Sequence, residues 1–460
     1  MILDNHYEDT IIAQCTPQGS GAIALLRLSG KNALAVADAI GRLPNNKTLL
    51  TQNTHTIHFG LIVDKNKTII DQVLFLVMHA PHTFTGDNTV EITCHNNPFI
   101  INNIISAALN VGARIAQNGE FSQRAVLNNK IDITQAEAIN DLIHANTQLA
   151  LKQSLSQLHG SFSHWITTIE KQLIKALALS DASFEFLDEE NMEFNAHINE
   201  IIVDCLARIS SLQKTFNQQQ QIRQGIRIAI IGSVNAGKSS FFNALLNQER
   251  AIVTNIAGTT RDSIEAGVYK DGNYWTLIDT AGQRKTHDII EHIGITRSYE
   301  EAQKADIILL VFDGSQQISL EEIAVYKDLY EKYHNKIILI KNKSDLPTQL
   351  HSFFEQKKHV IVSSLTKTNI DQVEQNIQQK IAHLFENIES PFLLNKRHFN
   401  VLLSIEKELL HIGTMLMGNV QYELVSYHLK NAISILSELS GKTISEAGMD
   451  AIFREFCIGK

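Results

Sequence analysis

The chain has 460 residues, of which 44% are hydrophobic and 19% are charged, with only six prolines. This composition is typical of a folded globular protein and excludes a disordered or fibrous chain. The net charge of −9 excludes a uniformly basic surface, so a nucleic acid could bind only at a local patch. At ~150 residues per domain, the length indicates about three domains.

The four cysteines are scattered without a C-x-x-C pair. Their spacing argues against a zinc site and a disulfide framework, and it favours a reducing compartment. The opening residues MILDNHYEDT contain no basic segment of the kind that begins a secretory signal. No apolar run approaches the ~18 residues that a membrane span needs, so we expect a cytoplasmic protein that does not enter a membrane.

The first part of the chain, residues 1–128, is predicted to be a mixed α/β domain. Short apolar runs bounded by turn residues indicate strands at 22–28, 71–78 and 89–94. Longer apolar stretches indicate helices at 32–40 and 99–109.

The pattern changes after residue 128. From 129 to 224, apolar residues recur at helical spacing and predict a helical domain. Residues 225–383 alternate strand-like runs with helical stretches, which indicates an α/β domain with a parallel sheet and crossover helices. Helical periodicity returns from 384 to 460, with Gly441 at an expected helix end. Neither helical set can bury its apolar face alone, so we expect the two to pack together around an inserted α/β domain.

The strand-like run RIAIIG leads into the sequence Gly232-x-x-x-x-Gly237-Lys238-Ser239, which precedes a helical stretch. This is the context of a P-loop, whose glycines let backbone N–H groups surround phosphates. We expect Lys238 to reach the β and γ oxygens and Ser239 to ligate Mg²⁺. A P-loop alone does not distinguish ATP from GTP.

A second motif identifies the base. The run KIILI is followed by the sequence N-K-S-D at residues 342–345. The carboxylate of Asp345 can accept from both the N1–H and the 2-amino group of guanine, and adenine lacks this pair of donors. The triplet at 363–365 follows the next predicted strand, where either a loop that contacts the base or a plain turn is expected.

Two segments between these motifs complete the pattern. Asp279 begins a D-T-A-G sequence, which places an acid near Mg²⁺ and a glycine N–H near the γ-phosphate. The upstream sequence GTTRD contains Thr260, whose hydroxyl is expected at the remaining Mg²⁺ position. Four elements in this order predict a guanine-nucleotide hydrolase. From the residues alone, either Gln283 or Glu291 could orient the attacking water.

Together with the terminal FCIGK, these motifs resemble the MnmE (TrmE) family of tRNA uridine-modification GTPases. The stretches TPQGSGAIALLRLSG, FTGDNTVEITCH and GEFSQRAVLNNKIDITQAEAINDLI are also similar to that family's pattern, so the likeness covers the full length. It implies an N-terminal tetrahydrofolate-binding and dimerisation domain and a central helical domain with an inserted Ras-like G domain. The sequence departs from the family where His95-Asn96-Asn97 replaces a His-Gly-Gly pattern and where the base loop reads SSL.

By this resemblance, Arg27, Glu91, Lys130 and Lys460 contact a tetrahydrofolate derivative, in its 5,10-methylene or 5-formyl form. Their chemistry agrees, because Arg and Lys can pair with the carboxylates of folate and Glu can accept from its pteridine edge. Cys457, in the FCIGK ending, is expected to be a reactive thiolate rather than a buried or prenylated cysteine.

The resemblance also implies that K⁺ replaces an arginine finger when two G domains dimerise. The K⁺ ligands implied by it are Asn235, Thr254, Ile256 and Thr259. Glu291 matches the family's water-orienting glutamate, which favours it over Gln283. The residues expected to contact GTP are Asn235, Ala236, Gly237, Lys238, Ser239, Ser240, Thr254, Asn255, Ile256, Ala257, Gly258, Thr259, Thr260, Asp279, Thr280, Ala281, Gly282, Asn342, Lys343, Ser344, Asp345, Ser363, Ser364 and Leu365.

The implied function is GTP hydrolysis within a system that adds a carboxymethylaminomethyl-type group at C5 of the tRNA wobble uridine, U34. The implied partners are tRNA, a second copy of the chain and the flavin-dependent protein MnmG. The alternative is a non-catalytic switch GTPase that controls a partner in ribosome assembly or signalling, and folate binding would discriminate between the two.

Overall fold

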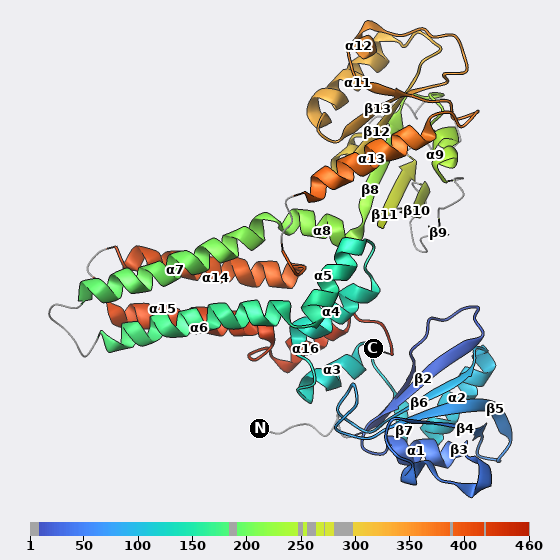
Figure 1. Ribbon diagram of the computed structural model, residues 1–460, viewed down its shortest axis with the longest axis vertical. Coiled ribbons are helices and arrows are strands. Elements are labelled where there is room, and N and C mark those ends of the chain that lie inside the picture. The colour runs from blue at the N-terminus through green and yellow to red at the C-terminus, as the bar shows by residue number, and fades with distance from the viewer. Residues whose placement is uncertain are drawn as a thin grey trace. The chain divides into compact units, whose positions relative to one another are not determined.

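The computed structural model describes residues 9–183, 191–246, 252–254, 264–270, 272–279, 298–386, 390–417 and 420–459. The chain divides into two compact units, both drawn in Figure 1. Unit 1 comprises Met1–Asn140, Leu155–Ala207 and Asn400–Lys460, and unit 2 comprises Asp141–Ser154 and Arg208–Phe399. Mixed α/β regions and helical stretches are both present, which confirms the predicted fold class.

Unit 1 contains a seven-stranded sheet in the order β3-β4-β5-β6-β2-β1-β7. Its strands are β1 (Thr10–Gln14), β2 (Ile23–Ser29), β3 (Gly41–Arg42), β4 (Thr56–Val63), β5 (Ile69–Met78), β6 (Thr89–His95) and β7 (Ala113–Ile115). Helices α1 (Ala33–Ile40) and α2 (Pro98–Asn110) cover one face, where Val36 and Ile104 join a core with Phe75 and Ile92.

The three strands predicted in this region are confirmed as β2, β5 and β6. Strands β1 and β4 were not predicted, for a physical reason that differs between them. The apolar run of β1 is too short to show a period, and His58 and Gly60 interrupt the apolar pattern of β4. Pairing with neighbouring strands therefore decides their structure.

The helical stretches before and after the α/β region are α3 (Glu120–Leu127), α4 (Ile133–Ile143), α5 (Gln148–Leu158), α6 (Ser161–Ala182), α7 (Asn191–Lys214), α8 (Phe216–Gln224), α14 (Lys396–Met415), α15 (Tyr422–Ser440) and α16 (Glu446–Phe453). Within unit 1, α6 and α15 lie side by side, as Figure 1 shows. The hydroxyl of Ser426 on α15 bonds to Ser180 at 2.9 Å and donates to Asp181 at 2.7 Å. Helices from opposite sides of the α/β region thus pack together, and α15 ends at Gly441 with φ +83°.

Unit 2 contains a second seven-stranded sheet, in the order β14-β13-β12-β8-β11-β10-β9. Its strands are β8 (Ile226–Gly232), β9 (Ile252–Thr254), β10 (Ile264–Lys270), β11 (Asn273–Asp279), β12 (Ile307–Asp313), β13 (Ile337–Asn342) and β14 (His359–Ile361). The five strands from β14 to β11 are parallel, but β10 and β9 are antiparallel to their neighbours. The five strands predicted in this region are therefore confirmed as a parallel sheet. The two antiparallel edge strands, β9 and β10, were not predicted, and β10 and β11 form a hairpin too short for a crossover helix.

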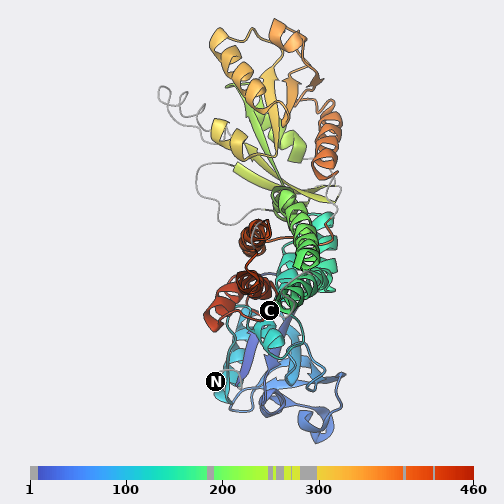
Figure 2. The same cartoon turned by 90° about the vertical axis from the view of Figure 1, so that its left-hand side faces the viewer.

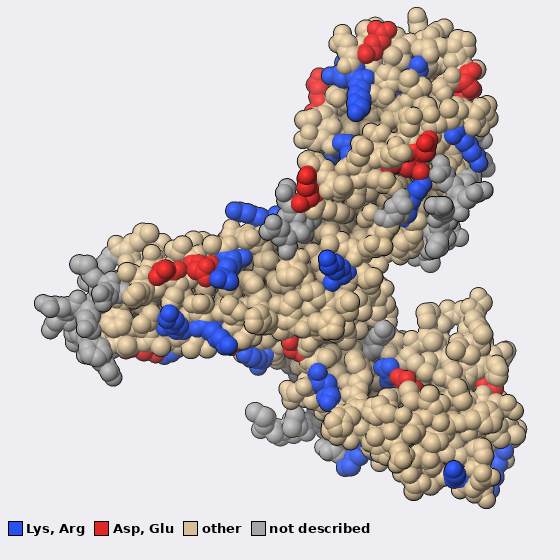
Figure 3. Space-filling view, in the orientation of Figure 1, with Lys and Arg blue, Asp and Glu red and all other residues tan. Residues whose placement is uncertain are grey.

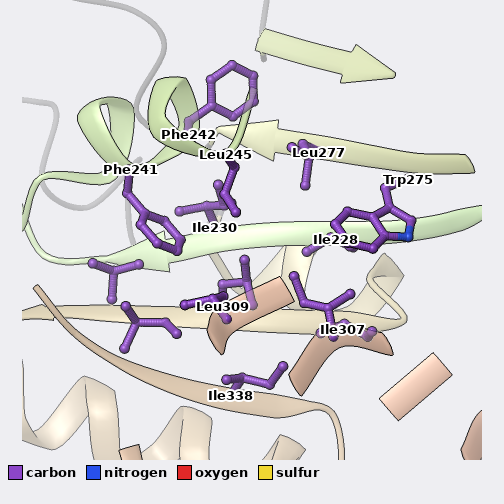
Figure 4. Packing of buried hydrophobic residues seen from close by; sticks show 14 of the residues in the cluster. Ile228, Ile230, Phe241, Phe242, Leu245, Trp275, Leu277, Ile307, Leu309 and Ile338 are labelled. Carbon is purple, nitrogen blue, oxygen red and sulfur yellow. The ribbon is translucent and has the colours of Figure 1, made fainter. Parts of the chain in front are cut away.

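Helices cover both faces of this sheet. Helices α9 (Lys238–Leu246) and α13 (Ile370–Phe385) cover one face, and α11 (Leu320–Tyr333) and α12 (Ser352–Glu355) cover the other (Figure 2). The central strand β8 serves both cores, because successive side chains point to opposite faces. Ile228 and Ile230 belong to the core under α9, which Figure 4 shows, and Ala229 and Ile231 belong to the other. Strand β8 is therefore buried on both faces up to Ile231, and the loop begins directly after the strand.

Hydrogen bonds attach residues 141–154 to both the helical and the α/β parts of unit 2. The hydroxyl of Thr147 donates to the carbonyl of Ile222 at 2.9 Å. The N–H of Gln148 donates to the carbonyl of Gly272 at 2.8 Å, in the turn of the β10–β11 hairpin. Unit 2 thus combines the α/β region with helical residues from before it. In neither unit does a described helix have the length and apolar character needed to cross a membrane.

Candidate functional site

The loop between β8 and α9 has the geometry of a phosphate-binding loop. Asn235 and Gly237 take positive φ values of +65° and +88°. Glycine is required at 237, because a Cβ atom there would contact the side-chain amide of Asn342. The unpaired N–H groups at the start of α9 follow directly, and such groups favour an anion. Ala236 is buried, whereas Ser239 and Ser240 are exposed.

Lys238 is held over this loop. Its Nζ donates to the carbonyls of Gly232 at 2.8 Å and Ser233 at 2.7 Å. The side chain is 8% exposed, and this burial lowers the pKa of Lys238, while the charge of Asp279 acts in the opposite direction. The ammonium group therefore lies where phosphate oxygens would replace the two carbonyls as its partners.

The base motif is tied to the phosphate loop. The amide of Asn342 donates to the carbonyl of Ala236 at 2.9 Å and accepts from the N–H and the hydroxyl of Ser364 at 3.1 and 2.8 Å. The hydroxyl of Ser363 donates to the Asp345 carboxylate at 2.5 Å. Both predicted base segments are thus joined to one another, with the Asp345 carboxylate held at the end of the sheet.

Lys343 has a partner that the sequence did not suggest. Its backbone is left-handed with φ +64°, and its Nζ lies 2.6 Å from Asp313 at the end of β12. Burial alone would raise the pKa of Asp313, but the bonds from Lys343 and Ser315 outweigh it and hold that pKa below the ordinary value. The one available signal is the position of Asp313 as the last residue of a fully buried strand.

Two other residues that are predicted to contact the guanine base lie in the same loops. The N–H of Ser344 donates to the carbonyl of Val362 at 3.1 Å, which fixes the backbone before Asp345. Leu365 is 82% exposed, so its backbone rather than a packed side chain is available to a ligand.

Two of the groups expected to hold Mg²⁺ lie on neighbouring elements. Ser239 stands at the start of α9, and Asp279 ends β11, the strand beside β8, where it is 1% exposed. A hydroxyl and a carboxylate are ligands that suit Mg²⁺ bound with a nucleotide. Thr254 ends the edge strand β9. The other predicted residues of this part, which lie outside the described residues, are Asn255, Ile256, Ala257, Gly258, Thr259, Thr260, Thr280, Ala281, Gly282, Gln283 and Glu291.

A second group of predicted residues lies in unit 1. Arg27 on β2 and Glu91 on β6 are direct neighbours in the sheet, with Nη2 and Oε1 2.7 Å apart. The pair is half-buried, and the rings of Phe84 and Phe121 lie 5.6 and 5.5 Å from the guanidinium. Lys130 donates to the carbonyl of Pro81 at 2.7 Å, in the same loop as Phe84. Arg27, with its partner Glu91, and Lys130 thus contact the same loop, which contains Pro81 and Phe84.

The chain end approaches this group through helix α3. The N–H of Gly119 donates to the carbonyl of Cys457 at 3.3 Å, and Asn118 forms a bridge with Ile458. Phe121, two residues after Gly119, contacts Arg27. Cys457 is exposed, and Lys460 lies outside the described residues.

Helix α3 is held by a partly buried network of charges that was not predicted. Arg124 is 1% exposed and donates to Glu120 at 2.9 Å and to Asp9 at 2.5 Å. Arg114 donates to Glu120 at 2.5 Å and also pairs with Asp9. The only sequence signal was Glu120 and Arg124 four residues apart, a spacing that also occurs on exposed helices.

The P-loop, its lysine and the Asp345 carboxylate of the N-K-S-D segment, at the ends of parallel strands, form the arrangement expected of a guanine-nucleotide-binding P-loop protein. Two family models match the chain: "GTP-binding protein TrmE N-terminus" over residues 10–130 and "MnmE helical domain" over residues 133–457. The chain therefore belongs to the MnmE family of tRNA modification GTPases, which confirms the resemblance found in the sequence.

Individual relatives agree over nearly the whole length. The "tRNA modification GTPase MnmE" of Lachnoclostridium phytofermentans is 36% identical, with 98% of this chain and 99% of the relative covered. The protein of the same name from Aquifex aeolicus is 38% identical, with 98% and 100% covered. Among solved structures, the G domain of the T. maritima FeoB iron transporter is similar at 26% identity and a TM-score of 0.26, over 35% of this chain and 98% of the G domain.

Proposed function

We propose that this protein hydrolyses GTP within a system that adds a carboxymethylaminomethyl-type group at C5 of U34 in tRNA. The one-carbon unit would come from a 5,10-methylene or 5-formyl tetrahydrofolate. The observation that carries the proposal is that one chain combines a guanine-nucleotide site with a second polar site beside an exposed cysteine. Relatives of 36% and 38% identity named as tRNA modification GTPases support it.

The folate part of the proposal rests on the surroundings of Arg27. Glu91 can accept from a pteridine edge, and Arg27 and Lys130 can pair with carboxylates. Phe84 and Phe121 offer aromatic faces beside Arg27. Cys457, whose carbonyl is bonded to the start of α3, is the candidate for a reactive thiolate, with Lys460 as a further proposed folate contact.

For GTP hydrolysis, we propose that K⁺ is the activating cation. Asn235 is exposed at the tip of the P-loop, where its carbonyl oxygen is available to an ion. Thr254, Ile256 and Thr259 complete the proposed K⁺ site. A cation there would stabilise charge that develops between the β- and γ-phosphates. We propose Glu291 rather than Gln283 for orienting the water.

We also propose that the protein works as a homodimer joined through unit 1. The face of the unit 1 sheet opposite α1 and α2 exposes Ile57, Phe59 and Leu74, at 65%, 55% and 44%. Ile57 and Phe59 lie on β4, and Leu74 faces Phe59 from β5. A contiguous apolar patch on a sheet is typical of an interaction surface.

The remaining proposed partners are tRNA and the flavin-dependent protein MnmG, in the cytoplasm. On the face shown in Figure 3, basic side chains lie among acidic ones rather than in one continuous field. A tRNA would therefore be bound through local contacts, and its affinity should depend less steeply on salt than that of a strongly basic protein.

The decisive experiment measures folate binding and cation-dependent turnover on the same full-length protein. Equilibrium dialysis should show binding of 5-formyltetrahydrofolate, which Arg27→Ala weakens at least about tenfold because a charged hydrogen-bonding partner is lost. GTP turnover in K⁺ should exceed turnover in Na⁺, and Asn235→Ala should remove the difference.

Each arm has its own control and its own contrary result. Lys31→Ala, an exposed cation near Arg27 in sequence, should leave folate binding unchanged. No folate binding, together with unchanged tRNA modification by Arg27→Ala, would reduce the protein to a GTPase switch. Equal turnover in the two salts would remove K⁺ from the proposal and leave the folate part standing.

A further inference from the structure

The hydroxyl of Tyr326 connects two strand ends beneath the phosphate loop. It donates to the carbonyl of Val311 at 2.8 Å and accepts from the N–H of Ser233 at 2.8 Å. Val311 and Gly232 form the last pair of the β12–β8 ladder. A Cβ atom on Gly232 would contact the Val311 carbonyl, so the backbones approach closely here. The tyrosine hydroxyl thus closes the ladder at the point where β8 becomes the P-loop.

The ring that carries this hydroxyl is firmly placed. Tyr326 is 3% exposed on helix α11, and its ring packs edge-on against Phe354 with centroids 5.4 Å apart. Burial raises the pKa of Tyr326 to about 12, so the hydroxyl keeps its proton at neutral pH. It can therefore donate to one backbone group and accept from another at the same time.

The bond to Ser233 also affects Lys238, because the two share one peptide group. A trans peptide is planar, so its N–H and C=O point in opposite directions and move together. The N–H of the Gly232–Ser233 peptide bonds to Tyr326, and its carbonyl accepts from Lys238 Nζ at 2.8 Å. The Ser233 carbonyl, in turn, accepts from Lys238 at 2.7 Å and from the Ala236 N–H at 3.3 Å.

We propose that Tyr326 is a positioning residue for GTP binding, which acts through the Gly232–Ser233 peptide on Lys238. By fixing the plane of this peptide, the hydroxyl fixes the entry of the P-loop and the direction from which Lys238 approaches the phosphates. The role concerns the β- and γ-phosphates, which Lys238 reaches, and not the base or the α-phosphate. It rests on the nucleotide site alone and is independent of the folate and tRNA proposals.

The first test compares nucleotides that differ in phosphate number. Tyr326→Phe keeps the ring and removes the hydroxyl, and Tyr330→Phe is the matched control, since Tyr330 lies on the same helix against Phe353. Competition with a fluorescent GDP analogue should show GTP and GDP affinities about tenfold lower for Tyr326→Phe, or about 1.4 kcal/mol, with GMP affinity unchanged. Tyr330→Phe should change none of the three.

Two results would overturn the proposal. An equal loss for GMP, GDP and GTP would indicate a general structural defect, and unchanged affinities would show that the hydroxyl does not position the loop.

A second test begins with hydrogen exchange in the unsubstituted protein, where the result does not depend on whether the variant folds. The Ser233 amide should exchange with deuterium as slowly as the strand amides of β8, because its acceptor is buried. Tyr326→Phe should speed exchange at Ser233 at least tenfold while the β8 amides keep their protection. Fast exchange at Ser233 in the unsubstituted protein, or loss of protection along all of β8 in the variant, would contradict the proposal.

Discussion

The nucleotide site of unit 2 and the Arg27–Glu91 site of unit 1 are built in different ways. In unit 2, the P-loop residues expected to contact phosphate are contiguous, and the residues expected to contact the base lie at or just beyond the ends of strands β13 and β14. In unit 1, two side chains that lie 64 residues apart in the chain meet across antiparallel strands. A site made of contiguous loops can be recognised from sequence motifs, whereas a site made of opposed side chains exists only once the strands have paired.

The largest expected effect tests whether the unit 1 site depends on its buried charges. Arg124→Ala should lower the free energy of unfolding of unit 1 by about 3 kcal/mol, because Glu120 stays buried with one partner fewer. GTP affinity should not change. Since the chain has two tryptophans, Trp165 in unit 1 reports its unfolding in urea once Trp275→Phe has removed the other signal.

The loss of stability in Arg124→Ala should also depend on pH. Burial would raise the pKa of Glu120, but hydrogen bonds from Arg114, Gln117 and Arg124 hold it below its ordinary value of 4.5. A lowered native pKa contributes stability above pH 4.5 that is lost as the pH falls further. The deficit of Arg124→Ala should therefore be full at pH 7 and shrink below pH 4.5. A deficit that does not vary with pH would exclude Glu120 as its cause.

The next largest effect concerns GTP binding at the nucleotide site of unit 2. Lys238→Ala should weaken GTP binding about 100-fold, or about 2.7 kcal/mol, because a buried ammonium that faces the phosphates is removed. The proposed folate binding by unit 1 should be unaffected. Fluorescence titration with a GDP analogue measures the change, and Lys304→Ala, an exposed lysine of the same unit, is the control. Similar losses for both lysines would point to a general charge effect instead.

The smallest effect probes base recognition. Ser363→Ala removes the hydroxyl that holds Asp345, so the carboxylate should bind the guanine 2-amino group less well. The preference for GTP over ITP, which lacks that amino group, should fall about fivefold, within the ~1 kcal/mol expected for one hydrogen bond. Leu365→Ala, at an 82% exposed position in the same loop, should keep the preference. An unchanged preference in Ser363→Ala would show that Asp345 is held without Ser363.

The sequence predicted the parts of the fold that have a clear local pattern. Strand β8 and the P-loop after it were found because a buried apolar run and a glycine-rich loop are both contiguous. The antiparallel edge was not found, because nothing in the sequence of β10 reveals the direction of its partner. The Lys343–Asp313 pair was likewise missed, since it joins the ends of two strands whose adjacency only the sheet order shows.

In the second site, chemistry alone could not single out Arg27 or Glu91 among the 40 basic and 49 acidic residues of the chain. The resemblance to a family selected them, and the structure places them opposite one another. The supporting network of Asp9, Arg114, Glu120 and Arg124 was not predicted, because its charges meet, and Glu120 and Arg124 become buried, only when separate segments pack together.

The position of the last described residues has a practical consequence for handling the protein. Ile458 pairs with Asn118, and a Cβ atom on Gly459 would lie 2.5 Å from the carbonyl oxygen of Gln14. A purification tag fused beside this segment would therefore add atoms next to a crowded seam between two backbone segments. Placing the tag at the other end, or removing it with a protease before assays, would keep that seam as the native chain forms it.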